Sequence, residues 1–223
     1  MSRSRSKKTD LRGADADVLK IVAVQSGDPR RIRRVLDSGE PLPATLVPHL
    51  IALLGADRAA REAMRGLRAI AVQRPGALID ALLDVRQSRV IRRRLARVMS
   101  DCRTPGVVEA LLQAGDDDHI SVRIQCARTL FLLRRRHPEL EVDGERVMTA
   151  IRKEIGRGAQ DIGLVFTLLA LVFPPAPIRV AYRSLRGSNA RARGFALEYL
   201  NGVVPPDLRE KLAPIVERLT PKR

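Results

Sequence analysis

The sequence predicts an all-α fold in which about five helical pairs stack as an α-solenoid, with a capping helix or helices at each end. An arginine recurs at Arg61, Arg92 and Arg123, in steps of 31 residues, and returns at Arg193. Each of these arginines directly follows an apolar residue, and a proline stands 17 or 18 residues before it. A unit of about 30 residues with a proline and an arginine at fixed positions is the signature of a helical repeat protein.

Composition and charge agree with a folded helical chain. Of the 223 residues, 45% are hydrophobic, and aromatic residues contribute only 3%, all of them from Phe131 onward. Core volume must therefore come from Leu, Val, Ile and Ala, which suits helices packed on helices. The net charge of +16 makes an anionic partner plausible. The alternative is a compositional bias of the genome, because Arg outnumbers Lys by 35 to 6.

The chain divides into a tail, a repeat array and two caps. Residues 1–14 are polar, basic and aperiodic, and they predict a disordered tail. Residues 15–39 predict a capping helical pair, since Pro29 opens a helix that stops at Gly39. The predicted repeats are 43–72, 75–102, 105–137, 143–173 and 174–201, and a polar C-terminal cap follows over 205–220.

The repeats share a local scheme. A proline is tolerated in the first turn of the first helix, and a polar residue precedes the second helix, where its side chain accepts a backbone N–H. The predicted cap positions are Asp57, Ser88, His119 and Asn189. Residues 162–173 are apolar almost all round, which predicts a helix buried on several sides.

This pattern resembles the HEAT repeat of the armadillo-like and PBS-lyase-like α-solenoids over residues 43–201. One unit reads PGVVEALLQAGDDDHISVRIQCARTL from Pro105 to Leu130. Residues 105–217 are also similar to the HEAT-repeat region attached to some bacterial nucleotide-transporter-like proteins, notably in IRVAYRSLRGSNARARGFALEYLNGVVPPDLREKLAPIVE. The resemblance implies a right-handed solenoid. In those relatives the array lies beside a multi-helix transporter, and these 223 residues contain no such segment.

The resemblance also assigns a structural role to the recurring arginine. In HEAT arrays the matching arginine commonly bonds the turn aspartate of its own or a neighbouring unit. The positions implied in this ladder are Arg61, Arg92, Arg123, Arg193, Asp57 and Asp118.

Sequence motifs of catalysis, cofactor binding and metal binding are lacking, so we expect a non-enzymatic protein without cofactor or metal. The segment GRGAQDIG is not a phosphate-binding loop, because it follows no strand. His49, His119 and His137 have no second ligand at metal-binding spacing. Among enzymatic HEAT-like families, the alkylpurine DNA glycosylases use aromatic residues, whereas this chain has no Trp. Nothing singles out a chromophore site of the kind expected in a phycobilin lyase.

The cysteines and the apolar runs predict a cytoplasmic location. Cys102 and Cys126 stand on apolar helical faces and are expected to be free, buried thiols in a reducing compartment. No secretory signal follows the basic N-terminus. The longest apolar run, residues 162–173, is too short to span a bilayer.

The candidate partner-binding surface is a stripe of arginines. Arg89, Arg93 and Arg97 recur at helical spacing and share one side of a predicted second helix. Residues that could extend the stripe are Arg58, Arg65, Arg86 and Arg128. The alternative is a solvated face of Arg–Glu pairs that uses Glu62 and Glu109. Two other clusters, 30–34 and 134–136, lie near helix ends, where cations favour the helix dipole.

Two functions fit this surface. The first is a scaffold for protein–protein interaction, whose concave face binds a protein partner with an acidic surface, such as the cytoplasmic face of a membrane protein. The second is sequence-independent binding of nucleic acid or another polyanion through phosphate contacts alone. Stacking on single-stranded bases is not expected, because the first 130 residues contain no aromatic side chain.

Overall fold

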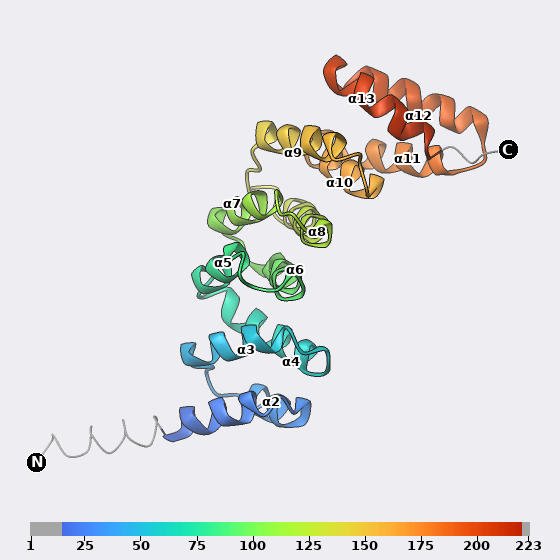
Figure 1. Ribbon diagram of the computed structural model, residues 1–223. Coiled ribbons are helices and arrows are strands. Elements are labelled where there is room, and N and C mark those ends of the chain that lie inside the picture. The colour runs from blue at the N-terminus through green and yellow to red at the C-terminus, as the bar shows by residue number, and fades with distance from the viewer. Residues whose placement is uncertain (1–14, 220–223) are drawn as a thin grey trace, which may run out of the picture. The chain divides into compact units, whose positions relative to one another are not determined.

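The computed structural model describes residues 15–219, and within that range every regular element is a helix (Figure 1). This confirms the all-α prediction. The predicted tail, residues 1–14, lies outside the described residues. The chain divides into two compact units, residues 1–103 and 104–223.

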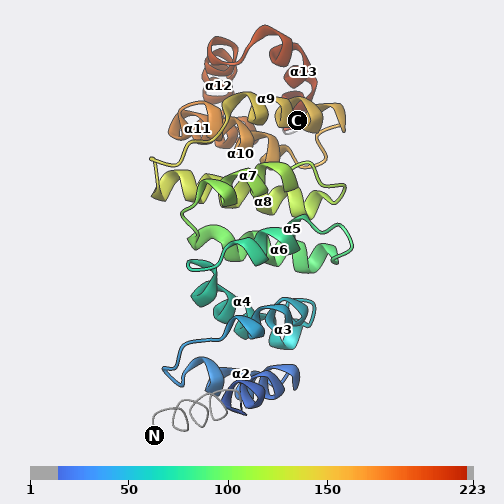
Figure 2. The same cartoon turned by 90° about the vertical axis from the view of Figure 1, so that its left-hand side faces the viewer.

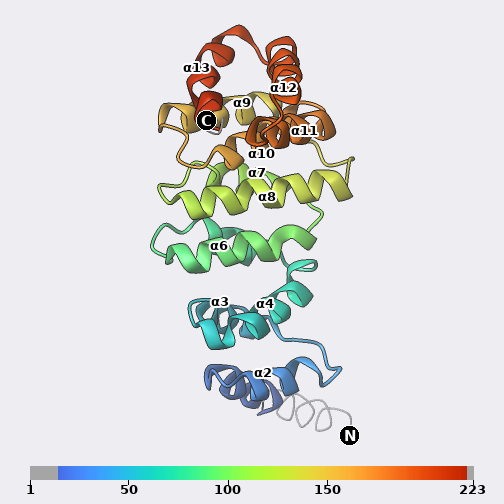
Figure 3. The same cartoon turned by 90° about the vertical axis from the view of Figure 1, so that its right-hand side faces the viewer.

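The first unit contains a helix over residues 15–25 and seven further helical elements. These are α2 (Pro29–Leu36), η1 (Ala44–Leu46), α3 (Val47–Leu53), α4 (Asp57–Ala71), α5 (Gly76–Leu83), α6 (Arg89–Val98) and η2 (Met99–Asp101). Helix α3 packs against α4, and α5 packs against α6. Helix α4 also contacts both α2 and α6, so these three helices lie next to one another within the unit (Figure 3).

Close packing of α4 depends on a glycine. A Cβ atom at Gly66 would lie 3.0 Å from the side chain of Leu36 and 3.1 Å from that of Leu50. The missing side chain lets α2 and α3 approach the middle of α4. Around this point Leu50 and Leu67 are fully buried, which builds the aliphatic core that the composition predicts.

The second unit contains seven α-helices among its described residues. They are α7 (Pro105–Ala114), α8 (Ile120–Arg136), α9 (Gly144–Gly156), α10 (Ile162–Val172), α11 (Pro175–Arg186), α12 (Ala190–Val203) and α13 (Pro206–Glu217). Helices α7 and α8, α9 and α10, and α11 and α12 pack as pairs (Figure 2). Helix α10 contacts α8, α9 and α11, so the prediction that this apolar helix is buried on several sides is confirmed.

Short polar side chains cap the N-termini of several helices. Ser88 accepts a hydrogen bond from the Ile91 amide, and Asn189 accepts one from the Ala192 amide, as predicted. Asp143 and Asp161 cap α9 and α10 in the same way. These contacts satisfy amides that have no partner inside the helix.

Two of the predicted caps are wrong. Asp57 is the first residue of α4, and its carboxylate bonds a distant arginine instead of a helix amide. His119 occupies the position before α8 but makes no side-chain cap, and its own amide donates to Asp117 Oδ1 at 2.7 Å. Asp117, two residues before the histidine, therefore organises this turn.

Both cysteines are free and buried, as expected. Burial raises the pKa of the Cys102 thiol to about 11, and the nearby Asp101 carboxylate adds to the effect. Since the thiolate is the reactive form, Cys102 is an inert core residue at neutral pH.

Candidate functional site

Three of the recurring arginines bind backbone carbonyls in the last turn of the preceding helix or in the loop that follows it. Arg92 donates from Nε to the carbonyl of Leu82 at 2.9 Å. Arg123 donates from Nη1 to the carbonyl of Asp117 at 2.7 Å. The last carbonyls of a helix have no partner within it, so Arg92 satisfies one at the end of α5, whereas Arg123 satisfies a carbonyl of the turn after α7. Both arginines are buried, which makes these contacts structural.

The other two recurring arginines differ from each other. Arg193 repeats the contact and donates to the carbonyl of Gly187 at 2.8 Å, at the end of α11. Arg61 is exposed, and no partner of its side chain occurs among the described residues. The recurring arginine is therefore structural at three of its four positions, and at the first position, Arg61, it is solvated.

The two aspartates implied in the ladder, Asp57 and Asp118, make other contacts with their side chains or use their backbone. Asp118 meets Arg123 through its backbone carbonyl, at 3.0 Å. Asp57 instead pairs with Arg94, whose hydrogen bond holds the pKa of this carboxyl below its ordinary value. Arg94 also donates to the carbonyl of Leu54 at 2.5 Å. Asp57 is therefore bound by Arg94, two residues after the recurring Arg92, and not by Arg61.

Ion pairs instead join one helical pair to the next. Three of them connect residues that are 37 positions apart. These pairs are Asp57 with Arg94, Glu109 with Arg146, and Asp116 with Lys153. In each case the ion pair joins a helical pair to the one that follows it in the chain.

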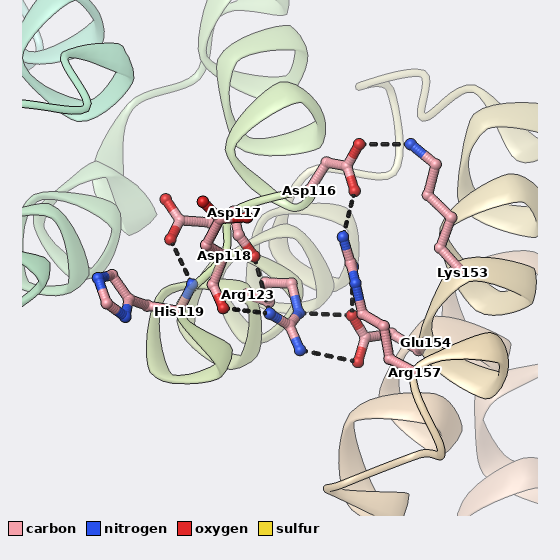
Figure 4. Close-up of polar contacts among 8 residues, drawn as sticks. All are labelled: Asp116, Asp117, Asp118, His119, Arg123, Lys153, Glu154 and Arg157. Atoms are coloured by element: carbon pink, nitrogen blue, oxygen red, sulfur yellow. Dashed lines mark hydrogen bonds and ion pairs between the residues drawn. The ribbon is translucent and has the colours of Figure 1, made fainter.

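The densest network lies in the second unit, between the acidic turn after α7 and helix α9 (Figure 4). Arg123 and Glu154 form a buried ion pair with both side chains 3% exposed, and Nε lies 2.5 Å from Oε1. Arg157 bridges Glu154 at 3.0 Å and Asp116 at 2.8 Å. Lys153 binds the other oxygen of Asp116. The cations of α9 are thus neutralised by carboxylates of their own unit.

Acid is expected to weaken this network through Asp116. The hydrogen bond from Lys153 holds the pKa of this carboxyl below its ordinary 3.8, although partial burial opposes the effect. A lowered folded-state pKa contributes stability above the ordinary pKa that is lost as the pH falls through the folded value. Thermal melts of wild type and Asp116→Asn should therefore differ slightly near neutral pH and converge in strong acid. A difference that grows toward low pH would contradict this assignment.

The first unit presents a group of exposed arginines that have no carboxylate partner, which we call the arginine face. Among the described residues no ion pair or hydrogen bond of their guanidinium groups is found. Its members lie on α2, α4 and α6 and are Arg30, Arg31, Arg34, Arg58, Arg61, Arg89, Arg93 and Arg97. Helices α2 and α6 contain no acidic residue at all. The three helices are neighbours, so the charges accumulate within one unit.

Four of the predicted binding residues belong to the arginine face, and three do not. Arg65 is exposed but pairs with Asp37 and, at 3.4 Å, with Glu62. Arg86 pairs with Asp84 at 2.9 Å within its own turn, although its side chain is 88% exposed. The remaining predicted residue, Arg128, is exposed on α8 of the second unit. The four members of the face are Arg58, Arg89, Arg93 and Arg97.

The alternative of Arg–Glu pairs is met in part, because Glu62 pairs with Arg65 of the predicted stripe. Glu62 is buried and binds Arg33 at 2.6 Å in addition to Arg65. Glu109 pairs with Arg146 in the second unit. No contact of either carboxylate with Arg89, Arg93 or Arg97 occurs among the described residues.

Sequence reasoning missed half of the arginine face. Arg30, Arg31 and Arg34 lie within the cluster that was explained by the helix dipole, and Arg61 by the repeat position. The absence of acidic residues over 29–36 was the available signal. For Arg61 the sequence offered no such signal, because the arginines at the same repeat position, Arg92, Arg123 and Arg193, are structural.

The histidines take part in local contacts. His49 lies 3.3 Å from the Gln25 amide nitrogen, and His137 lies 3.2 Å from Glu139. Within residues 15–219 no group of three metal-ligating side chains comes together. None of the helices in that range combines the length and apolarity needed to cross a membrane.

Comparisons with protein-family models, with curated proteins and with solved structures find no match to this chain.

Proposed function

We propose that this chain is a non-enzymatic, HEAT-like repeat protein that binds the phosphate backbone of duplex nucleic acid through the arginine face, without reading base sequence. The observation that carries the proposal is the set of eight exposed arginines without carboxylate partners on α2, α4 and α6. The cations of α9 in the second unit are paired with carboxylates, so exposed cations in this chain are not unpaired as a rule.

Unpaired arginines at this density cost stability in the free protein. Arg89, Arg93 and Arg97 follow one another at four-residue spacing, and like charges at that spacing destabilise a helix by about 0.2–0.5 kcal/mol per pair. Arg30 and Arg34 repeat the arrangement on α2. A bound polyanion would remove this repulsion and release its own condensed counterions.

The composition of the face favours phosphate over an acidic protein surface, the partner that the sequence suggested first. Protein interfaces have an apolar core enriched in aromatic side chains. Helices α2, α4 and α6 contain no aromatic residue, and none of their large apolar side chains is exposed. The face can offer hydrogen bonds and charge but little apolar contact, which suits a sugar–phosphate backbone.

Two further features bear on where the protein acts. The free, buried thiols of Cys102 and Cys126 are compatible with a reducing compartment. We therefore propose a cytoplasmic location, in which nucleic acid is the most abundant extended polyanion. Catalysis is not part of the proposal, since binding by charge alone needs no reactive group.

A salt titration tests the proposal. Fluorescence anisotropy of a labelled DNA duplex should show tight binding at about 50 mM salt, with log K falling linearly against log salt. Eight phosphate contacts would give a slope of about −7, at 0.9 per contact. A second duplex of unrelated sequence should bind within about threefold, because phosphate contacts carry no base information. No binding at low salt, or a strong preference for one sequence, would refute the proposal.

A further inference from the structure

A second surface, in the other unit, has the chemistry of a protein-binding site. Helices α11 and α12 pack as a pair and leave an open pocket of about 370 Å³ between them. Its walls come from both helices at the same helical spacing. The lining residues are Pro177, Val180, Ala181 and Ser184 on α11 and Ala192, Phe195, Ala196 and Tyr199 on α12. Each set spans positions i, i+3, i+4 and i+7, so the pocket continues as a groove about 10 Å long.

The rim of this groove is apolar and exposed. Val180 is 60% exposed and Phe195 is 59% exposed, and they stand on opposite helices. A large aromatic side chain left in solvent beside a pocket is a frequent feature of interaction surfaces. The groove therefore differs from the arginine face, which exposes no large apolar side chain.

The charge around the groove selects the partner. Helix α11 carries exposed arginines at Arg179, Arg183 and Arg186 and no carboxylate. On α12 the guanidinium of Arg191 lies over the ring of Phe195, 5.7 Å from its centroid. The only acidic residue on either helix is Glu198. An occupant with carboxylates beside its apolar side chains complements this surface.

We propose that the α11–α12 groove binds an acidic amphipathic helix of a partner protein. One apolar stripe of that helix lies between Val180 and Phe195, and its flanking carboxylates face Arg183 and Arg191. The groove is about two helical turns long, which matches a helix that anchors itself by residues at i, i+3, i+4 and i+7. This proposal does not depend on the arginine face, since all of its residues lie in the second unit.

Designed peptides test the proposal on the full chain. The first peptide is an amphipathic helix with Leu at i, i+3, i+4 and i+7 and Glu at the flanking positions. A second peptide replaces Leu by Ala, and a third replaces Glu by Gln. Binding is measured by anisotropy on a chain whose Arg89, Arg93 and Arg97 are changed to Gln, so that the arginine face captures less of the acidic peptides. The first peptide should bind about tenfold more tightly than either of the others.

Substitutions locate the site. Phe195→Ser and Val180→Ser should each weaken binding of the first peptide about tenfold, because they remove opposite walls of the groove. Val85→Ser is the matched control, since Val85 is 78% exposed in the first unit and should leave binding unchanged. All three positions are largely exposed, so circular dichroism should report an unaltered fold.

Three outcomes would overturn the proposal. One is equal affinity for the Leu and Ala peptides, which would mean that charge alone accounts for binding. Another is binding that is insensitive to Phe195→Ser and Val180→Ser. The third is a protein that sediments as a dimer and becomes monomeric on Phe195→Ser, because the groove would then be covered by a second copy of the chain.

Discussion

Changing Arg89, Arg93 and Arg97 together to Gln is expected to weaken binding of duplex DNA by on the order of a thousandfold at about 50 mM salt. Each phosphate contact contributes about 0.9 to the slope of log K against log salt, which corresponds to a factor of about 15 per contact at that concentration. The three side chains are exposed on α6 and have no carboxylate partner among the described residues. In addition to the hydrogen bond from Arg94, the charge of Arg93 lowers the pKa of the Asp57 carboxyl. Arg89 and Arg97 have no such carboxylate neighbour among the described residues and are fully available to the ligand.

The salt dependence of the same variant identifies the mechanism. The magnitude of the slope should fall by about 2.7, because three counterion-releasing contacts are lost. A variant that lost affinity through misfolding would not show this proportion. Thermal melts should stay within a few degrees of wild type, since no buried contact is removed.

The matched control changes three exposed arginines elsewhere. Arg179, Arg183 and Arg186 on α11 also have no carboxylate partner among the residues that the structure describes. Their replacement by Gln lowers the net charge by the same amount, yet it should change DNA affinity by less than about threefold. If the two triple variants lost affinity equally, net charge rather than the arginine face would account for binding.

Replacing Glu154 by Gln is expected to destabilise the folded chain by about 3 kcal/mol or more. The substitution keeps the shape of the side chain and leaves the buried guanidinium of Arg123 without its counter-charge. Arg123 keeps its hydrogen bonds to two backbone carbonyls, but these do not neutralise it. For a chain of this size the melting temperature should fall by roughly 6–12 °C.

An exposed ion pair provides the control for this prediction. Glu109 pairs with Arg146 between the same two helical pairs, with side chains that are 59% and 41% exposed. Glu109→Gln should therefore cost less than about 1 kcal/mol. Chemical denaturation of both variants measures the contrast. If both variants lost the same free energy of unfolding, burial would not determine how much these ion pairs contribute to stability.

Much of the local structure follows from single helices and could be predicted. The caps at Ser88 and Asn189 depend on a side chain and an amide three residues later, so the sequence contains both partners. The burial of α10 follows from its lack of a polar side. Asp57 was assigned wrongly because its partner, Arg94, lies 37 residues away in the next helical pair.

The candidate site was predicted only in part, for the same physical reason. The sequence does not show whether a given arginine will meet a carboxylate in the folded chain. Arg65 and Arg97 look alike in one dimension, yet Arg65 meets Asp37 and Arg97 meets no carboxylate among the described residues. The apolar groove between α11 and α12 was missed because it is formed by two helices together.

The sequence by itself determined the helical class of this protein, the start of several of its helices, and the surplus of positive charge. These properties depend on neighbours within one or two helical turns and on composition. The tertiary structure decided which arginines are neutralised across helical pairs. Asp37 lies 28 residues from Arg65 and Asp116 lies 41 residues from Arg157, so these partners meet only when helices pack. The binding surface proposed for the first unit consists of the arginines that this pairing leaves without an ion pair.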